Sequence, residues 1–476
     1  MKRFWLVLLA LGMLFAFSSS VFAADVKFTG SFYAAGMYQD KTSLIKDSEY
    51  DTSTAFYYQR LRVGMYFVVT PALSLVTRFD AMERAWGAPR TAADTVGGVV
   101  NDVDSAGTVA ENENIAFDWA YIQYVSPIGM FQVGYQQDGA WGTVFGDNSV
   151  PLAKIQYVMR KGPITGIAYM GKIYEGNRTA KNAGILATDV DADKYMLGVV
   201  YAASKDLQAG LLFVHIRDTS DKAAVVLGPA PFTYLNTKKI YTLQPYFKAK
   251  FGPVALEGEL QYFWGDIKAT DTAGGAKVKL DMLSVYLDAV ADLGMFYAGG
   301  TFAYLSGDKD ATLDGKLKGG LNTGGIDWNP TLILFNYDKR YWAGSLPGYN
   351  AIDVPVGTDA TAVMSNAWFF QGRAGVRPVP ALNIMASLTY AFADKKADFS
   401  AIAAIPAHIP MTKQAKDDYG WELDVTATYA ITNNLSYMLG VGYLWTGDYY
   451  KGSEFFANGN KLQDDYLVIN KLTLTF

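Results

Sequence analysis

Apolar and polar side chains alternate along much of the chain, most clearly over residues 421–445. Trp421, Leu423 and Val425 alternate with polar residues, and after the turn signal at 431–434 a second alternating run follows. Because successive side chains of a strand point to opposite faces, each run has one apolar face and one polar or small face. Runs of about ten residues with this pattern are typical of strands that cross a bilayer in a closed barrel.

Short turns divide the chain into pairs of such runs. Segments rich in Pro, Gly, Asn and Asp mark these turns, and they are Thr70–Ala72, Ser126–Gly129, Lys161–Pro163, Ser204–Asp206, Gly252–Pro253, Ala291–Gly294, Pro378–Pro380 and Thr432–Asn434. With a first strand near 26–38 and a last strand near 466–476, they predict an all-β fold. The expected architecture is a transmembrane antiparallel β-barrel of about 18 strands, with 16 as the alternative if two runs are not strands.

The segments between the paired strands are long and are expected as loops at the other end of the barrel. The longest are 83–114 and 306–365, and 137–151 is predicted as a further external loop. An apolar run, Thr331–Tyr337, lies inside the longest loop. That loop is expected either to narrow the pore from within or to cap its outer mouth. Residues 24–476 are therefore predicted to form a single barrel domain.

Residues 1–23 are predicted to be an export signal. Lys2 and Arg3 precede an unbroken apolar run at 4–17, and small residues end at Ala23. The apolar run is too short for a spanning helix, which needs about 20 residues. Cysteine is absent, which excludes disulfides, thiolate metal sites and a lipid-modified N-terminal cysteine.

Charged side chains on the strands are expected to point into the barrel. Facing lipid near mid-membrane, Arg or Lys would cost about 2–4 kcal/mol. The alternation places a basic and an acidic set on the inner face, predicted to line the pore: Arg60, Arg62, Arg78, Arg373 and Arg377, and Asp80, Glu257, Glu259, Glu422 and Asp424. Two interpretations stay open. Opposed walls of opposite sign would order polar solutes in a water-filled pore, whereas pairing across strands would only stiffen the wall.

Composition fits this design. Half of the chain is hydrophobic (50%), yet the mean hydropathy is only +0.06, as expected when apolar residues occupy alternate positions. There are 32 Tyr and 10 Trp, and rings near strand ends, including Trp119, Tyr262, Trp421 and Trp445, are mostly predicted to form girdles at the membrane interfaces. Stacking platforms for carbohydrate are the alternative for these rings.

Enzymatic chemistry finds little support. The two histidines, His215 and His408, have no identifiable nucleophile in a neighbouring register, so neither catalysis nor a cofactor is expected. The acidic runs 101–104 and 189–193 lack the full spacing of a calcium loop, so no metal site is expected. A net charge of −5 argues against nucleic acid as a partner.

The last stripe of apolar residues, which begins at Tyr466, ends on Phe476. It resembles the closing strand of bacterial outer-membrane barrels, whose terminal Phe is a signal for the barrel assembly machinery. With the export signal, alternating strands, short turns and long loops, the chain from residue 24 onward resembles the outer-membrane porins of Gram-negative bacteria. The resemblance implies a passive channel for small hydrophilic solutes and ions in the outer membrane, in contact with its lipid and assembled as a homotrimer.

A second resemblance leads to alternative functions. Arg60–Arg62, Arg78 and the Trp86–Gly87 corner are similar to alginate-export-type channels, which implies a dedicated channel for anionic sugars or polysaccharide export. Glu257, with the other inner-face carboxylates, departs from the basic lumen of those channels. A further alternative is a structural or conduit barrel occupied by a partner protein.

Overall fold

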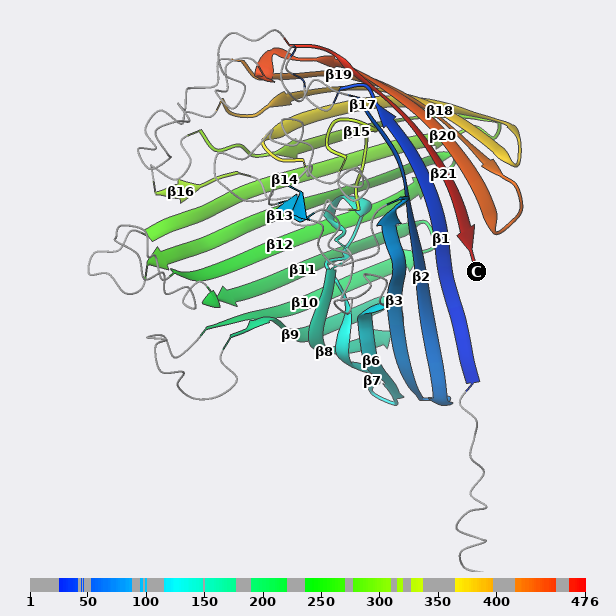
Figure 1. Ribbon diagram of the computed structural model, residues 1–476. Coiled ribbons are helices and arrows are strands. Elements are labelled where there is room, and N and C mark those ends of the chain that lie inside the picture. Colours follow the sequence, from blue (N-terminus) through cyan, green and yellow to red (C-terminus); the bar gives the residue numbers. More distant parts are fainter. Residues whose placement is uncertain are drawn as a thin grey trace, which may run out of the picture.

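The computed structural model describes residues 25–41, 44, 46, 53–87, 95–96, 99–100, 115–148, 150–176, 190–220, 236–269, 277–309, 315–319, 327–336, 364–396, 416–450 and 462–476. Within these ranges, eighteen antiparallel strands close into one barrel (Figure 1). The barrel strands are β1 (Asp25–Gln39), β2 (Thr54–Thr70), β3 (Leu73–Ala85), β6 (Ala116–Ser126), β7 (Gly129–Asp138), β8 (Val150–Lys161), β9 (Ile164–Glu175), β10 (Asp191–Ser204), β11 (Leu207–Asp218), β12 (Asn236–Phe251), β13 (Val254–Ala269), β14 (Lys277–Asp292), β15 (Phe296–Leu305), β17 (Ala367–Val379), β18 (Leu382–Ala393), β19 (Asp418–Ala430), β20 (Leu435–Thr446) and β21 (Asp465–Thr475).

Closure comes from the first and last strands. β1 pairs with β2 along its length and also with β21, in a register that sets Ser31 opposite Thr475. The barrel therefore has no unpaired edge, which would otherwise be a template for aggregation. The predicted fold class is confirmed, with the larger of the two predicted strand numbers.

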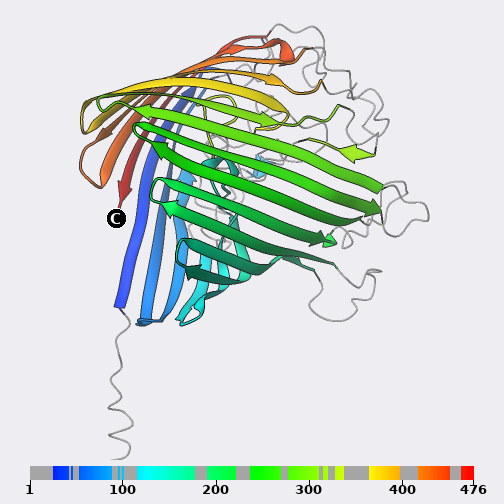
Figure 2. The same cartoon turned by 180° about the vertical axis from the view of Figure 1, so that it is seen from behind.

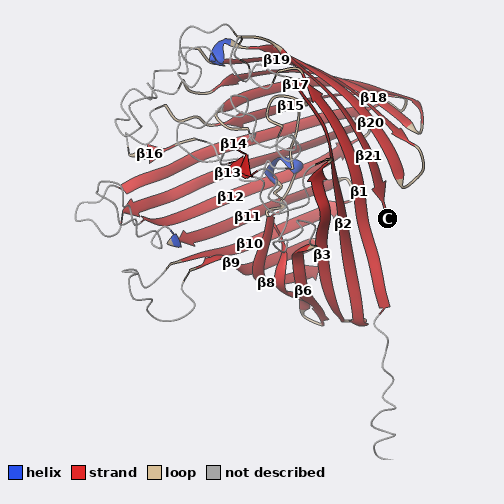
Figure 3. Cartoon of the chain, viewed as in Figure 1, coloured by secondary structure: helices blue, strands red, loops and turns tan. Residues whose placement is uncertain are grey.

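Short elements complete the described structure. Outside the barrel wall, β4 (Thr95–Val96) and β5 (Val99–Val100) form a small hairpin, and β16 (Lys316–Leu317) runs parallel to the start of β14. The 3-10 turns η1 (Val144–Gly146) and η3 (Asp448–Tyr450) appear as short blue segments among the strands in Figure 3. Among the residues with described structure, no helix is long and apolar enough to cross a membrane.

All eight predicted turns join consecutive strands, from Thr70–Ala72 between β2 and β3 to Thr432–Asn434 between β19 and β20. Figure 2 shows the hairpin turns of the back wall gathered at one end of the barrel, with the longer connections starting from the other. In outer-membrane barrels the short turns lie on the periplasmic side. We call this the short-turn end and the opposite one the long-loop end.

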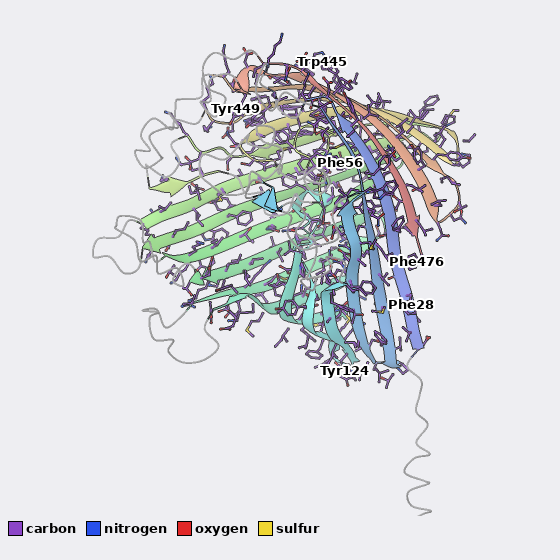
Figure 4. The ribbon with its side chains drawn as sticks, in the orientation of Figure 1. Phe28, Phe56, Tyr124, Trp445, Tyr449 and Phe476 are labelled. Atoms are coloured by element: carbon purple, nitrogen blue, oxygen red, sulfur yellow. The ribbon has the colours of Figure 1, made fainter. Side chains whose placement is uncertain are left out.

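Alternation along β19 separates an outer from an inner face. Trp421, Leu423 and Val425 are 46%, 38% and 43% exposed, whereas Glu422 and Asp424 between them are 0% and 3% exposed. The exposed set faces lipid, and the same apolar surface continues around the barrel to Phe28 and Phe476 on neighbouring strands (Figure 4). Strand β19 thus presents hydrocarbon-compatible side chains outward and keeps Glu422 and Asp424 inside, as the membrane requires.

Candidate functional site

The connection between β7 and β8 folds into the barrel. We call its residues 139–148 the Trp141 segment. The Trp141 indole donates a hydrogen bond to the backbone oxygen of Gln244 (2.9 Å), and the Thr143 backbone N–H and hydroxyl both donate to Glu259 (2.8 and 2.9 Å). The prediction of an external loop at 137–151 is wrong for these residues. Their polar groups form hydrogen bonds with the inner wall, and their aromatic rings pack against it.

Glycines on the inner wall make room for the Trp141 ring. A Cβ atom at Gly198 of β10 or at Gly210 of β11 would lie 3.1 Å from ring carbons of Trp141. Such contacts are tighter than ordinary packing. The ring also meets Tyr246 edge-on, with centroids 5.4 Å apart. Small residues on β10 and β11 therefore form the seat of this segment.

A second stretch, residues 327–336, also lies against the inner wall, and we call it the Trp328 segment. The backbone N–H groups of Ile333 and Leu334 donate to the two carboxylate oxygens of Glu422 (2.6 and 2.7 Å), and that of Leu332 donates to Asp424 (3.3 Å). A Cβ at Gly442 of β20 would lie 3.1 Å from Leu332. Of the two expectations for the longest loop, these contacts correspond to folding inward. Residues 331–336 form bends rather than a strand, and Tyr337 lies outside the described residues.

The two segments meet inside the barrel. Phe145 stacks on Tyr286 with centroids 5.1 Å apart, and the Trp328 ring packs edge-on against both. The Asp327 N–H donates to the backbone oxygen of Asp147 at 3.4 Å. Burial raises the pKa of the Asp147 carboxyl group, an effect that the neighbouring negative charge of Asp327 reinforces. An apolar cluster thus partitions the barrel interior.

Three of the predicted acidic residues support this partition. Glu259, Glu422 and Asp424 point inward, as the alternation predicts, but the two segments cover them and all three are buried. Their carboxylates accept backbone hydrogen bonds from chain segments about 90 to 116 positions away. These side chains are therefore anchors of the internal segments.

The arginines predicted on β2 and β3 pair with carboxylates of the same wall. Arg62 binds Asp80 through two bonds of 2.7 Å, and Arg60 lies 3.4 Å from Glu83. Arg78 binds Asp118.

The remaining predicted residues lie nearer the short-turn end. Arg373 binds Asp288 through bonds of 2.8 and 2.7 Å, and Arg377 lies 3.1 Å from Asp292 beside a short turn. Glu257 accepts a hydrogen bond from the Tyr286 hydroxyl at 3.1 Å. Of the two interpretations given for the inner charges, pairing across strands describes the geometry of all five predicted arginines.

The wall formed by β1–β3 and β6–β8 carries a further set of polar side chains. Beside the arginines, an amide ladder crosses three strands: Gln132 donates to Gln123 (2.9 Å) and Gln156 donates to Gln132 (2.7 Å). A hollow of about 160 Å³ is lined here by Ser31, Gly64, Tyr66, Arg62, Arg78 and Trp119. The sequence prediction missed this ladder, although all three glutamines occupy polar positions of alternating strands.

Aromatic residues divide between the two faces. Trp421 and Trp445 are exposed on the outer face, as predicted for a girdle. Trp119 does not belong to it, because its ring lies 3.5 Å from the guanidinium carbon of inward-facing Arg78. A local irregularity in the pairing of β3 with β6 explains the difference, since Asp118 is skipped and the alternation changes phase.

The weaker sequence signals have ordinary structural partners where they are described. His215 stacks on Tyr241 with ring centroids 4.5 Å apart. Asp191 and Asp193 bind Lys172 at 3.3 and 2.7 Å. His408 and the acidic run 101–104 lie outside the described residues. Within the described part of the chain, no group of three or more His, Cys, Asp or Glu side chains is arranged to hold a metal ion.

Solved structures of outer-membrane porins share this fold. The chain superposes on Pseudomonas aeruginosa OccK2 (OpdF), determined in complex with glucuronate, with a TM-score of 0.50 and 12% identity over 96% of this chain and 99% of that one. OpdL and OccK8 (OprE) of the same organism give TM-scores of 0.49 and 0.47 at 12% and 14% identity, covering 95% and 94% of this chain and 99% and 98% of theirs. No family model matches the sequence, and no curated protein matches it either.

The fold is shared with outer-membrane porins: a closed antiparallel barrel with short turns at one end and long loops at the other. Single-chain barrels of this kind belong in the outer membrane of Gram-negative bacteria. At 12–14% sequence identity, the similarity to these solved structures establishes the fold of the chain.

Proposed function

We propose that the chain is a semi-selective porin through which small hydrophilic solutes diffuse passively across the outer membrane. The observation that carries this proposal is the division of the barrel interior. The Trp141 and Trp328 segments fill one side with an apolar cluster, whereas on the wall of β1–β3 and β6–β8 the side chains of Arg60, Arg62 and Asp80 stay partly exposed. A narrowed polar passage along that wall would admit small solutes and hold back larger ones.

Within this passage we assign the lining role to Arg60, Arg62, Arg78 and Asp80. Their side chains are partly exposed or lie at the edge of the 160 Å³ hollow. Arg373, Arg377 and Glu257 would line the wider part between the Trp328 segment and the short-turn end. This placement is supported by Gln371, two positions before Arg373, which donates to the backbone oxygen of Pro330 (2.7 Å).

Two assembly properties belong to the same proposal. Phe476 continues the β21–β1 ladder, with its N–H donating to the Gly30 oxygen (3.0 Å), and we assign it the role of an assembly signal. We also propose a homotrimer in contact with outer-membrane lipid through the apolar outer face.

Single-channel recording in a planar lipid bilayer tests the function. Purified protein should insert as open, ohmic channels in KCl. A barrel that inserts, shows the heat-dependent electrophoretic shift of a folded porin and still stays silent would overturn the proposal. That outcome would favour the second candidate, a conduit barrel closed by its own segments or by a partner protein, which the apolar cluster in the lumen supports.

A dedicated channel for anionic sugars is the remaining candidate. The three arginines of β2 and β3 support it, as does the glucuronate bound by OccK2 (OpdF), a protein of the same fold. The ratio of chloride to potassium permeability, measured for the native protein and for Arg62→Ala, tests this candidate. A strong chloride preference that Arg62→Ala reduces would favour it over the semi-selective porin.

A further inference from the structure

We propose that the passage favours zwitterionic solutes of amino-acid size over anions and cations. This inference rests on the proposed function and specifies its substrate class. It comes from the arrangement of charge on the wall of β2, β3 and β6, where each arginine pairs with a carboxylate of a neighbouring strand.

The pairs can be followed from the long-loop end of the wall. Arg60 pairs with Glu83 at 3.4 Å, and Arg62 pairs with Asp80 at 2.7 Å. The Arg62 guanidinium also lies 4.0 Å from Asp118, which in turn binds Arg78. The three guanidinium groups and three carboxylates therefore form two clusters, Arg60 with Glu83 and the other four groups together, and their charges sum to zero.

Neighbouring groups on the wall add positive charge to this set. Lys471 of β21 adds one positive charge, and its ammonium group lies 4.5 Å from the centre of the Tyr33 ring. On β7, β8 and β10, Lys154 and Lys194 both bind Asp138, at 3.2 and 2.5 Å. Beyond the arginine set, the glutamine ladder is uncharged. These three lysines and Asp138 together add two positive charges to the described wall, whereas the arginine set beside the hollow is itself neutral and densely polar.

A wall of paired charges acts on a solute differently from a wall of one sign. The fields of two opposite charges about 3 Å apart largely cancel a few ångströms away, so a lone anion or cation gains little to offset the water it sheds. A zwitterion presents both signs at a similar spacing. Its carboxylate can bind a guanidinium while its ammonium group binds the adjacent carboxylate.

The groups needed for such an exchange are accessible. The side chains of Arg62, Asp80 and Asp118 are 25%, 14% and 20% exposed. A guanidinium has five N–H donors, and Arg62 directs two nitrogens at Asp80. The adjoining hollow of about 160 Å³ equals the share of about five waters in the liquid, which is room for a small solute.

Size-matched probes test the inference in proteoliposomes. Swelling rates would be compared for glycine (a zwitterion), glycolate (an anion) and ethanolammonium (a cation), together with the reversal potential across a KCl gradient. We expect glycine to enter fastest, and the ratio of chloride to potassium permeability to stay within about threefold of unity.

Substitutions that change the net charge of the wall give a second test. Asp118→Asn and Asp80→Asn each remove one negative charge, so both should shift the permeability toward chloride and glycolate by at least about threefold. Asp281→Asn is the matched control, because Asp281 is exposed and bonds to Tyr262, which faces outward, at 3.0 Å. It should behave like the native protein. Each variant is checked for the heat-dependent electrophoretic shift, and the two aspartates provide independent tests should one fail to fold.

The outcomes separate the two proposals. A native channel that strongly selects one ion sign, or that admits glycine more slowly than either ion, overturns the zwitterion inference while the porin function stands. Unchanged selectivity in both folded aspartate variants overturns it as well. A folded barrel that admits none of the probes overturns the proposed function itself.

Discussion

Replacing Glu422 with alanine should release the Trp328 segment from the barrel wall and widen the passage. Glu422 is fully buried and accepts the N–H groups of Ile333 and Leu334 at 2.6 and 2.7 Å. An ordinary intramolecular hydrogen bond contributes about 0.5–1.5 kcal/mol, so the substitution removes about 1–3 kcal/mol of anchoring. Because 1.4 kcal/mol is a factor of ten, the ratio of released to anchored segment should rise by about fivefold to 10².

Single-channel recording gives the readout, with Glu422→Gln as the graded control. Glutamine keeps the side-chain size and one acceptor oxygen, so its effect should fall between those of the native protein and the alanine variant. We expect larger conductance steps and more frequent fluctuation between levels for Glu422→Ala. If the folded alanine variant reproduced the native conductance and open-channel noise, Glu422 would not hold the segment in place and the account of the constriction would be refuted.

Other consequences of the same geometry can be measured separately. Trp141→Ala removes a large buried ring, a change that costs about 3–5 kcal/mol in a packed core, and should raise the conductance, whereas Trp445→Ala on the lipid face should leave it unchanged. Leu423→Arg places a charge on the lipid face and should lower the free energy of unfolding in vesicles by about 2–4 kcal/mol, measured by urea titration; no loss would contradict the assigned outer face. Burial raises the pKa of Asp147, so its contribution to the folded Trp141 segment is full below the ordinary aspartate value of about 3.9 and is lost as pH rises through the raised pKa. The conductance should therefore increase with pH across that window, and a pH profile for Asp147→Asn that matched the native one would exclude this group as the cause.

The alternation of apolar and polar residues determined the strands, the turns between them and the face that each side chain occupies. Trp421 and Glu422 are adjacent in sequence, yet one faces lipid and the other the interior, because strand geometry has a period of two and needs no distant partner. Pro and Gly likewise determine the short turns through their own backbone geometry, without a distant partner. The number of strands follows from these two local rules. The closure of the barrel, by pairing of the first strand with the last, comes from the tertiary structure.

Only the tertiary structure decided what the inner side chains do. Glu259 and Asp80 look alike in sequence, each an acidic residue on the polar face of a strand. Glu259 is covered by Thr143, 116 positions away, whereas Asp80 stays at the open wall beside Arg62. Such contacts depend on which loop folds back into the lumen, and loop residues 139–148 carry no periodic pattern that would reveal it. The physical reason is the sequence distance over which each effect acts. Alternation assigns each strand residue to a face from its neighbours alone, whereas the role of that face depends on distant segments that the closed barrel brings together.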